Sequence, residues 1–252
     1  MAPDAWVEAI ERATLDAVCP ETVAAIDGWL LPMDSGSIGR AKSAVPLRHA
    51  ALNVAEAENR VSTVEEIYES RGHQAVFRLA SHGNLDPLHK VLSARGYRPS
   101  QPTWVQTGSV AAMRAVTLAA PADVDDTPDE AWAQLFLGEG FDPVDGAHRI
   151  RNLSRAGSNV YGSLREGGRT LAGGAASFAH GWANVHGMRT HGPQRGKGLA
   201  GRVLAGLADA ATARGLTHVF LQVEADNLAA QSLYRRAGFT TAWAYEYWKK
   251  TA

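Results

Sequence analysis

The sequence predicts an α/β fold, and three observations support this prediction. Of the 252 residues, 45% are apolar and 20% are charged, which is the composition of an ordinary globular protein. In the second half of the chain, strand-like runs come first and helical patterns then separate the later strands, as in α/β architectures. A glycine-containing loop at 194–198 joins one of these strands to a long helix. A chain of this length forms one large domain or two small ones.

The first part of the chain, residues 1–114, is predicted to form a smaller unit of helices and short strands. Helices are indicated by apolar residues three and four apart, and strands by short apolar runs between turn residues. Thr63 and Glu66 have the spacing of a capping box, although Thr63 could also lie inside a longer helix. The expected helices are 5–18, 61–70 and 85–94, and the expected extended segments are 28–31, 44–47, 76–79 and 103–107.

A polar segment at 119–130, which contains Pro121 and Pro128, is the predicted seam between two units. We therefore expect one domain over residues 1–114 and a second over residues 115–252. In the second unit, the expected helices are 131–137, 198–214 and 228–236, and the expected strands are 159–164, 171–178, 182–190, 219–224 and 241–248.

An internal repeat relates the two units. Arg71-Gly72 aligns with Arg214-Gly215 at an offset of 143 (214 − 71 = 143), and the segment around Gly96 aligns with that around Gly238 after a one-residue slip. Five of fifteen positions are identical, which either reflects two related strand–helix units or arises by chance. The other matched pairs are Val76-Phe77 with Val219-Phe220 and Asn84 with Asn227.

Charge and cysteine content exclude several classes of function. Lys and Arg total 25 against 26 Asp and Glu, so no basic excess exists for nucleic-acid binding, although a local basic patch can still bind a small anion. A single cysteine allows no internal disulfide and no cysteine cluster for a metal, and we expect no metal. The longest stretch without a charged residue, 170–188, contains glycines, Asn and His and is interpreted as two strands around a turn. With no signal-peptide pattern at the start, we expect a cytoplasmic protein without a membrane partner.

The loop from Gln194 to Ala200 has the chemistry of an anion-binding turn. The first backbone amides of a helix are unpaired and carry the positive end of the helix dipole, and glycines let an anion approach them closely. Arg195 and Lys197 add positive charge. Neither dinucleotide-binding nor P-loop glycine spacing is present. The loop therefore binds a phosphate-like group or is simply a strand–helix turn.

Two segments in the second half resolve part of this ambiguity. Arg195-x-x-Gly198-x-Ala200 is followed about 30 residues later by Asn227-x-x-Ala230-x-x-Leu233-Tyr234 and then Gly238-Phe239. Together they resemble the two signature segments of the GCN5-related N-acetyltransferase (GNAT) superfamily over roughly residues 130–252. The resemblance implies a mixed, twisted sheet flanked by helices.

With the repeat, the resemblance implies two tandem GNAT-like halves, of which the N-terminal half is degenerate. At the offset of 143, residues 52–57 contain no glycine and Val91 stands in the place of Tyr234. Some members of the superfamily, including mycothiol synthases, are tandems of this kind, and the run Val223–Asn227 looks similar to theirs.

The resemblance also implies acetyl-CoA as the co-substrate and assigns roles to individual residues. The backbone of Met188, Arg189 and Thr190 would hold the pantetheine arm where the neighbouring strands part, and Asn227 would contact it. Tyr234 would protonate the leaving thiolate, although its ring could instead only pack beneath the pantetheine. The pyrophosphate would bind at Arg195, Gly196, Lys197, Gly198, Leu199 and Ala200; the proline that usually precedes this loop is displaced to Pro193.

The base that deprotonates the amine is less defined by the sequence. Glu224 is the first candidate, because strand alternation puts it on the same face as Gln222. His186 shares a strand face with Met188 and Thr190, but a satisfied structural histidine is the default interpretation. Glu139 is a third candidate, since it lies where related proteins have the loop that faces the acceptor.

Two further groups lie outside these motifs. Trp243, Tyr245 and Tyr247 share one strand face, for which core packing is the default, while one of them could wall the acceptor pocket. Arg40, Lys42 and Arg48 could reach an acidic substrate, although a solvated surface role is the default. We therefore expect an N-acetyltransferase that moves an acetyl group from acetyl-CoA to a primary amine of a small molecule or peptide. The alternatives are a catalytically silent acyl-CoA-binding regulatory module and a mycothiol-synthase-like tandem acetyltransferase.

Overall fold

The computed structural model describes residues 3–137 and 142–250. Eight strands form its main sheet, which is mixed and flanked by helices, as predicted. These strands are β4 (Phe77–Ala80), β5 (Tyr97–Ser109), β6 (Asp123–Asp125), β7 (Asn159–Glu166), β8 (Arg169–Ala179), β9 (Trp182–Thr190), β10 (His218–Glu224) and β11 (Thr240–Lys250). Their order is β4-β11-β5-β10-β9-β8-β7-β6. Within this sheet β9 and β10 run parallel, and the other neighbouring pairs are antiparallel.

A second, small antiparallel sheet consists of β1 (Thr22–Ile26), β2 (Trp29–Met33) and β3 (Val45–Pro46). Ala44, next to β3, joins it to β4 of the main sheet through an isolated parallel bridge with Phe77. A short 3₁₀ helix, η1 (Gly39–Lys42), connects β2 to β3. The α-helices are α1 (Asp4–Val18), α2 (Val54–Glu69), α3 (Asp86–Ala94), α4 (Val110–Arg114), α5 (Glu130–Leu137), α6 (Pro143–Arg155), α7 (Leu199–Ala213) and α8 (Leu228–Arg236).

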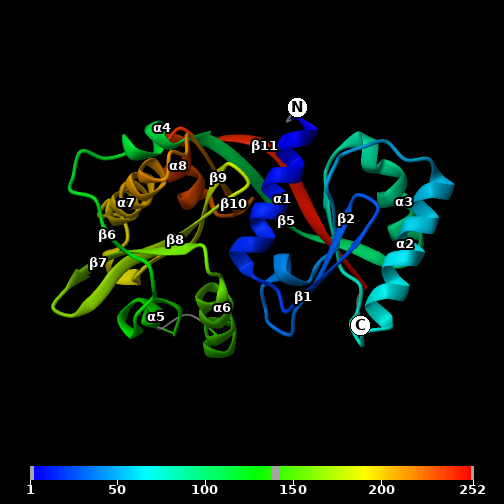
Figure 1. Ribbon diagram of the computed structural model, residues 1–252, viewed down its shortest axis with the longest axis horizontal. Helices are drawn as coiled ribbons and strands as arrows, with labels where there is room; N and C mark the ends of the chain where they lie inside the picture. The colour runs from blue at the N-terminus through cyan, green and yellow to red at the C-terminus, as the bar shows by residue number, and fades with distance from the viewer. Residues whose placement is uncertain (1–2, 138–141, 251–252) are drawn as a thin grey trace.

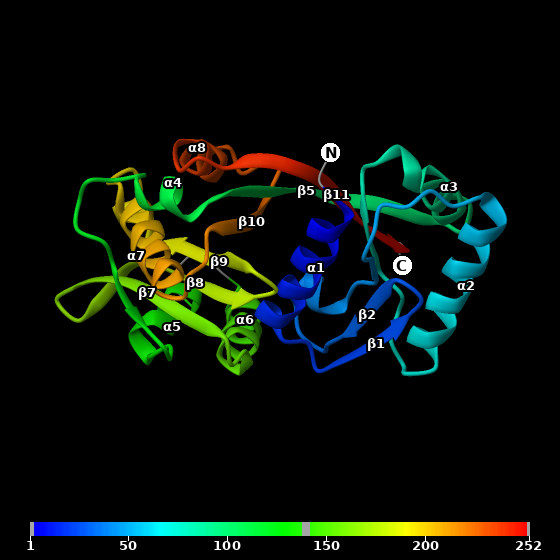
Figure 2. The same ribbon diagram turned by 45° about the horizontal axis from the view of Figure 1, so that its top comes forward.

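The long strands β5 and β11 connect two lobes of the molecule (Figure 1). One lobe carries α2, α3 and the small sheet, and the other carries β6 to β9 with α7 on one face and α5 and α6 on the other. Helix α1 lies between the lobes, which is seen again in the rotated view (Figure 2). The functional site described below is built where α1, β5, β9, β10 and β11 meet.

The core follows the apolar patterns of the sequence. Helix α7 buries one stripe against β6–β9, and Leu204 and Leu207 within that stripe have no exposed surface. Each such side chain stabilises the fold by about 1.5–3 kcal/mol through removal from water. The uncharged stretch 170–188 forms β8, the turn at His180-Gly181 and β9, so the interpretation as two strands around a turn is confirmed.

The two repeated segments form interleaved strand–helix–strand units, β4-α3-β5 and β10-α8-β11. Strand β11 lies between the two strands of the first unit, and β5 lies between the two strands of the second. At the offset of the second part of the repeat (238 − 96 = 142), Tyr245 corresponds to Thr103, and these two residues pair directly. Two related units would produce such an arrangement, in which equivalent strands pair with each other at equivalent residues. The tandem origin and the boundary at 114/115 nevertheless stay predictions, because one sheet continues across that boundary.

Several local predictions were wrong. Helix α2 begins at Val54, so Thr63 lies inside it; the capping box is formed by Asn53 and Glu56, whose side chains each bond the other's backbone amide. Strand β1 was missed, because it is half exposed and has a weak apolar pattern. Helix α6 was also missed, although Asp142 caps it and Pro143 occupies its first position, which is a recognised start signal. Within the predicted seam, residues 123–125 form the edge strand β6.

Candidate active site

The parallel strands β9 and β10 separate at one end and leave an opening in the sheet. Their pairing runs from Trp182 and His218 as far as Val185 and Leu221, and both strands then continue without each other, β9 to Thr190 and β10 to Glu224. The expected parting of the strand pair is therefore present. It exposes backbone groups of β9 in the middle of a sheet, where a ligand can bond to them as a further strand would.

Strand β9 is irregular at this opening. Its pairing with β8 shifts between the partners of Gly173 and Ala175, and Gly187 has a φ of +62°, so a bulge interrupts the strand. The Met188 side chain packs over Gly174, where a Cβ atom would collide with its sulfur. Because the bulge breaks the simple alternation of faces, His186 and Met188 line a cavity while Thr190 does not.

The glycine loop follows β9 through a 3₁₀ turn, Gly192–Gln194, and leads directly into α7. Gly196 and Gly198 have φ values of +78° and +75°, a conformation that L side chains rarely adopt. No atom lies within 4 Å of the position a Cβ would take on either glycine, so the backbone is open to a ligand. The charged side chains are held locally, since Lys197 bonds Gln194 at 2.7 Å and Arg195 bonds the Thr190 carbonyl at 3.4 Å. This open glycine loop at a helix N-terminus has the features of an anion-binding turn.

Asn227 and Tyr234 both belong to α8, on the opposite side of the opening. Asn227 is the N-cap of this helix, and its Oδ1 accepts the Ala230 amide at 3.1 Å, which leaves its side-chain NH₂ available to a ligand. Tyr234 packs edge-on against Phe239 and is only 7% exposed. Burial raises the pKa of Tyr234 to about 12, opposed by the nearby Arg189 cation, so its hydroxyl is protonated at neutral pH.

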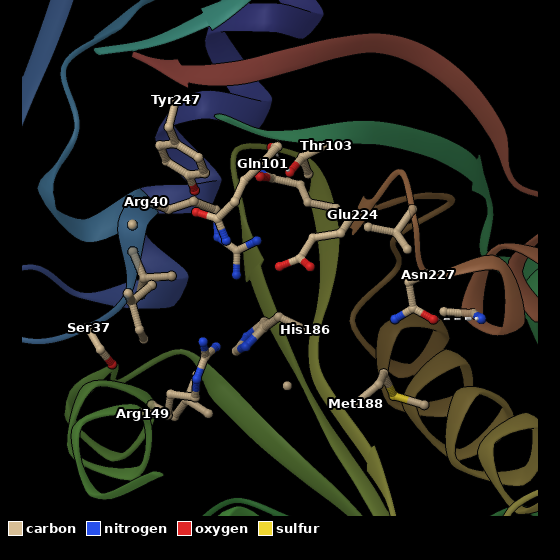
Figure 3. Close-up of a pocket in the computed structure, with 18 of the residues that line it drawn as sticks. Ser37, Arg40, Gln101, Thr103, Arg149, His186, Met188, Glu224, Asn227 and Tyr247 are labelled. Carbon is tan, nitrogen blue, oxygen red and sulfur yellow. Dashed lines mark hydrogen bonds between the residues drawn. The ribbon is translucent and has the colours of Figure 1, made fainter. Parts of the chain in front are cut away.

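A cavity of about 380 Å³ occupies the opening and is lined from both predicted halves of the chain. Figure 3 shows Arg40, Arg149, His186 and Glu224 pointing into it from different sides, with Asn227 and Met188 at the end nearer α7 and α8. Of the predicted site residues, the cavity brings together Met188, Arg189, Glu224, Asn227 and Tyr234. The predicted site residues that do not line it are Thr190 and the loop residues Arg195, Gly196, Lys197, Gly198, Leu199 and Ala200.

The three candidate bases differ in position. Glu224 is exposed at the end of β10 and lines the cavity with Gln222, as strand alternation predicted. The His186 ring is 8% exposed, and neither ring nitrogen has a hydrogen-bond partner among the described residues, so the interpretation as a satisfied structural histidine is wrong. Burial, reinforced by the Arg40 cation, lowers the pKa of His186 to about 3, which makes it neutral but a weak base. Glu139 lies outside the described residues.

The aromatic and cationic residues outside the motifs also have defined places. Trp243 packs in the core, whereas Tyr245 and Tyr247 are buried and line the cavity. The Tyr245 hydroxyl donates to Gln222 at 2.8 Å, which fixes that side of the wall. Arg40 and Lys42 line the cavity as well, so the default surface role was wrong for them. Arg48 does not line it and is 66% exposed beside Glu8.

Sequence reasoning missed several contributors to the cavity, among them Arg149, Gln101, Thr103 and Lys249. Arg149 comes from the unpredicted helix α6, which the Asp-Pro start signal could have located. Gln101 comes from the start of β5, which was hidden by Pro99 and Pro102, and Thr103 was predicted to lie in a strand but not at the site. Among residues 3–137 and 142–250, no group of three or more His, Cys, Asp or Glu side chains is arranged to hold a metal, and the absence of a metal stays a prediction. No helix in the same ranges combines the length and apolar character needed to cross a bilayer.

Comparison with solved structures agrees with the architecture of the site. A GCN5-related N-acetyltransferase from Kribbella flavida superposes with a TM-score of 0.71 at 16% identity, covering 98% of this chain and 96% of that one. One from Sphaerobacter thermophilus gives 0.60 at 17% identity, with coverage of 99% and 93%. A tandem GNAT protein from the clavulanic acid biosynthesis pathway gives 0.62 at 13% identity, with coverage of 97% and 95%. At these identities the likeness concerns the fold, which is that of the GNAT acyltransferases.

A family model gives the more specific result. The model described as "Probable histone acetyltransferase Rv0428c C-terminal" matches residues 5–248, nearly the whole chain. The chain belongs to this family of GNAT acetyltransferases. No curated protein sequence matches the chain at a significant level.

Proposed function

We propose that the protein transfers an acetyl group from acetyl-CoA to a primary amine of a small molecule or a peptide. The observation that carries the proposal is the parting of β9 and β10 beside a helix N-terminus whose glycine loop is open to an anion. The opening and the loop lie in sequence along one strand, so a single extended ligand with a phosphate group at one end can occupy both. Acetyl-CoA has this shape.

The binding residues follow from the same geometry. The loop from Arg195 to Ala200 would hold the pyrophosphate with backbone amides and the helix dipole. The backbone of Met188, Arg189 and Thr190 would bond the pantetheine amides, and the Asn227 NH₂ would contribute a donor from α8. A backbone N–H at the bulge of β9 would polarise the thioester carbonyl, as in an oxyanion hole.

The chemistry requires two proton transfers. Glu224, directly or through one water, takes a proton from the amine as its nitrogen attacks the carbonyl carbon. A new C–N bond forms, the C–S bond breaks, and the leaving thiolate receives a hydrogen bond and a proton from the Tyr234 hydroxyl. His186 is too weakly basic for the first step, and we assign it to hydrogen bonding with the bound acceptor.

Calorimetric titration of acetyl-CoA into two isosteric variants tests the loop assignment. Gly198→Asn and Gly198→Asp both tolerate the left-handed backbone and differ by one negative charge. A unit charge about 4 Å from a phosphate costs roughly 4 kcal/mol at an effective dielectric of about 20, so the Asp variant should bind at least 100-fold more weakly than the Asn variant. Equal affinity in the two variants would contradict the assignment. Thiol release against a panel of amines then separates an enzyme from a silent acyl-CoA-binding module.

A further inference from the structure

The lining of the cavity is rich in positive charge, whereas the chain as a whole is not. Its described lining contains five cationic side chains, Arg40, Lys42, Arg149, Arg189 and Lys249, against the single carboxylate of Glu224. The formal net charge of the entire protein is −1. The positive charge is therefore concentrated where the acceptor must bind, and this concentration has to be stabilised by something that enters the cavity.

The cations lie close enough to disturb one another. After burial itself, the second cause that lowers the pKa of Lys249 is the Lys42 cation, and the second cause that lowers the pKa of Arg189 is the Arg149 cation. The Arg40 cation likewise contributes to the low pKa of His186. Like charges that lie near enough to lower one another's pKa destabilise the ligand-free site. An anion placed among them would remove that cost.

Neighbouring groups neutralise this charge only in part. The Arg149 Nε pairs with Asp145 at 2.6 Å, which leaves its terminal nitrogens for other partners, and the Lys42 ammonium donates to the Gly36 carbonyl at 2.8 Å. Arg40 has no ion pair and no hydrogen bond within the described part of the chain, yet its guanidinium points into the cavity (Figure 3). A buried or half-buried guanidinium of this kind matches a carboxylate or phosphate with its planar fork of donors.

The position of these groups separates them from the proposed phosphate site. Arg40 and Arg149 face each other across the end of the cavity that lies away from Asn227 and Met188 (Figure 3). The loop from Arg195 to Ala200, where the pyrophosphate would bind, does not line the cavity. The donor's phosphates would thus not neutralise Arg40 and Arg149.

His186 supplies a second, independent sign that a polar ligand belongs here. His186 is 8% exposed and lines the same cavity as Arg40 and Arg149 (Figure 3), and both of its ring nitrogens lack partners in the described structure. An unpaired buried polar group costs about 1–3 kcal/mol, which a ligand that bonds to it would offset.

From these observations we propose that the acceptor amine also carries an oxyanion, a carboxylate or a phosphate, which Arg40 and Arg149 bind while His186 bonds to the same molecule. This inference rests on the proposed acetyl transfer and names its substrate class. A lysine-rich peptide would instead bring more positive charge into a cavity that is already cationic.

A series of matched amines tests this proposal. Glutamate, glutamine and glutamine amide have nearly the same size and carry two, one and no carboxylates; O-phosphoserine provides the phosphate, and lysine amide provides a cation. Each is titrated into the acetyl-CoA-free and CoA-saturated protein by calorimetry, and each is assayed by thiol release. Arg40→Gln and Arg149→Gln are compared with Arg48→Gln, an arginine of the first half that does not line the cavity.

We expect the dicarboxylate or the phosphate to bind at least tenfold more tightly than the amide, and lysine amide to bind worst. Arg40→Gln and Arg149→Gln should each weaken anionic acceptors by about 10- to 100-fold, the range for one lost hydrogen bond to a charged group, and Arg48→Gln should not. The acetyl-CoA affinity should stay the same in all three variants. Equal binding across the series, preference for lysine amide, or no binding of any anion would overturn the inference. If the wild-type protein does not bind acetyl-CoA at all, the proposed function itself would be refuted.

Discussion

Replacing Tyr234 by Phe removes one hydroxyl from the centre of the proposed chemistry and little else. The ring would keep its contact with Phe239, and the hydroxyl makes no hydrogen bond within residues 3–137 and 142–250 that folding would lose. We therefore expect the free energy of unfolding to change by less than about 1 kcal/mol, because no hydrogen bond is lost. The effect on the reaction should be much larger, since a proton donor would be missing.

The magnitude follows from the environment of the hydroxyl. A hydrogen bond to a developing charge in a buried site is worth about 1.5–3 kcal/mol, or about 10- to 150-fold in rate. Positioned general acids contribute roughly 10²- to 10⁴-fold. Because burial raises the pKa of Tyr234 to about 12, above the roughly 8.5 of an ordinary thiol, the proton moves to the thiolate against a pKa difference, and we expect an effect at the low end of the general-acid range. We expect kcat to fall about 100-fold with little change in the KM for acetyl-CoA.

The assay compares acyl donors with different leaving groups. A missing proton donor should matter less when the departing thiol is more acidic, whereas a packing defect would slow every donor alike. Tyr97→Phe is the matched control: the Tyr97 hydroxyl bonds Glu65 at 2.9 Å away from the cavity, so this variant should lose about 1–2 kcal/mol of stability and keep its kcat. Wild-type kcat in Tyr234→Phe would refute the assignment of the proton donor.

Three further predictions concern the base, the core and the two halves. Glu224→Gln should lower kcat about 100-fold, and less for acceptors of lower amine pKa, while Asp226→Asn on the same turn should not; equal losses across amines in a steady-state assay would argue against a base. Glu11→Gln should cost about 3–5 kcal/mol in urea unfolding, because it leaves Arg78 without the carboxylate of a buried 2.6 Å ion pair. Glu8→Gln, in the solvent-accessible pair with Arg12 whose side chains are 34% and 39% exposed, should cost under about 1 kcal/mol. A fragment of residues 115–252 should be insoluble or inactive alone and recover on co-expression with residues 1–114; an active, soluble fragment would contradict this.

Local patterns predicted most of the elements, and they failed where tertiary contacts decide. Strand β5 begins at Tyr97, whereas the sequence predicted a start at residue 103. The prediction was wrong because Pro99 and Pro102 lack the backbone amide that a strand interior normally needs. Pro102 is tolerated since the pairing with β11 is irregular between Tyr245 and Tyr247, where Gln101 takes a φ of +51°. No rule applied to a single segment could place that bulge, which depends on the register of a strand more than 140 residues later.

The site shows the same division between local and distant information. The loop, Asn227 and Tyr234 follow from spacing, because one strand–loop–helix unit and one helix N-cap position them. Arg40 and Arg149 are 109 residues apart and lie on η1 and α6, so only the folded chain brings them to one cavity. Sequence reasoning assigned Arg40 to the surface because an isolated arginine is usually solvated.

The interleaved sheet gives a reason to expect that the first half is needed for function although it lacks the glycine loop. Strand β11 has β4 and β5 as its neighbours, and both belong to residues 1–114. Without them, the strand that carries Tyr245, Tyr247 and Lys249 into the cavity has no partner within the described sheet, and its backbone groups would be left unpaired. In the reaction proposed above, the acyl donor would bind to the loop and strands of the second half alone, whereas the cationic end of the cavity also contains residues of η1 and β5 from the first half. The proposed donor site is therefore local in the chain, whereas the proposed acceptor site would exist only where the two halves share strands.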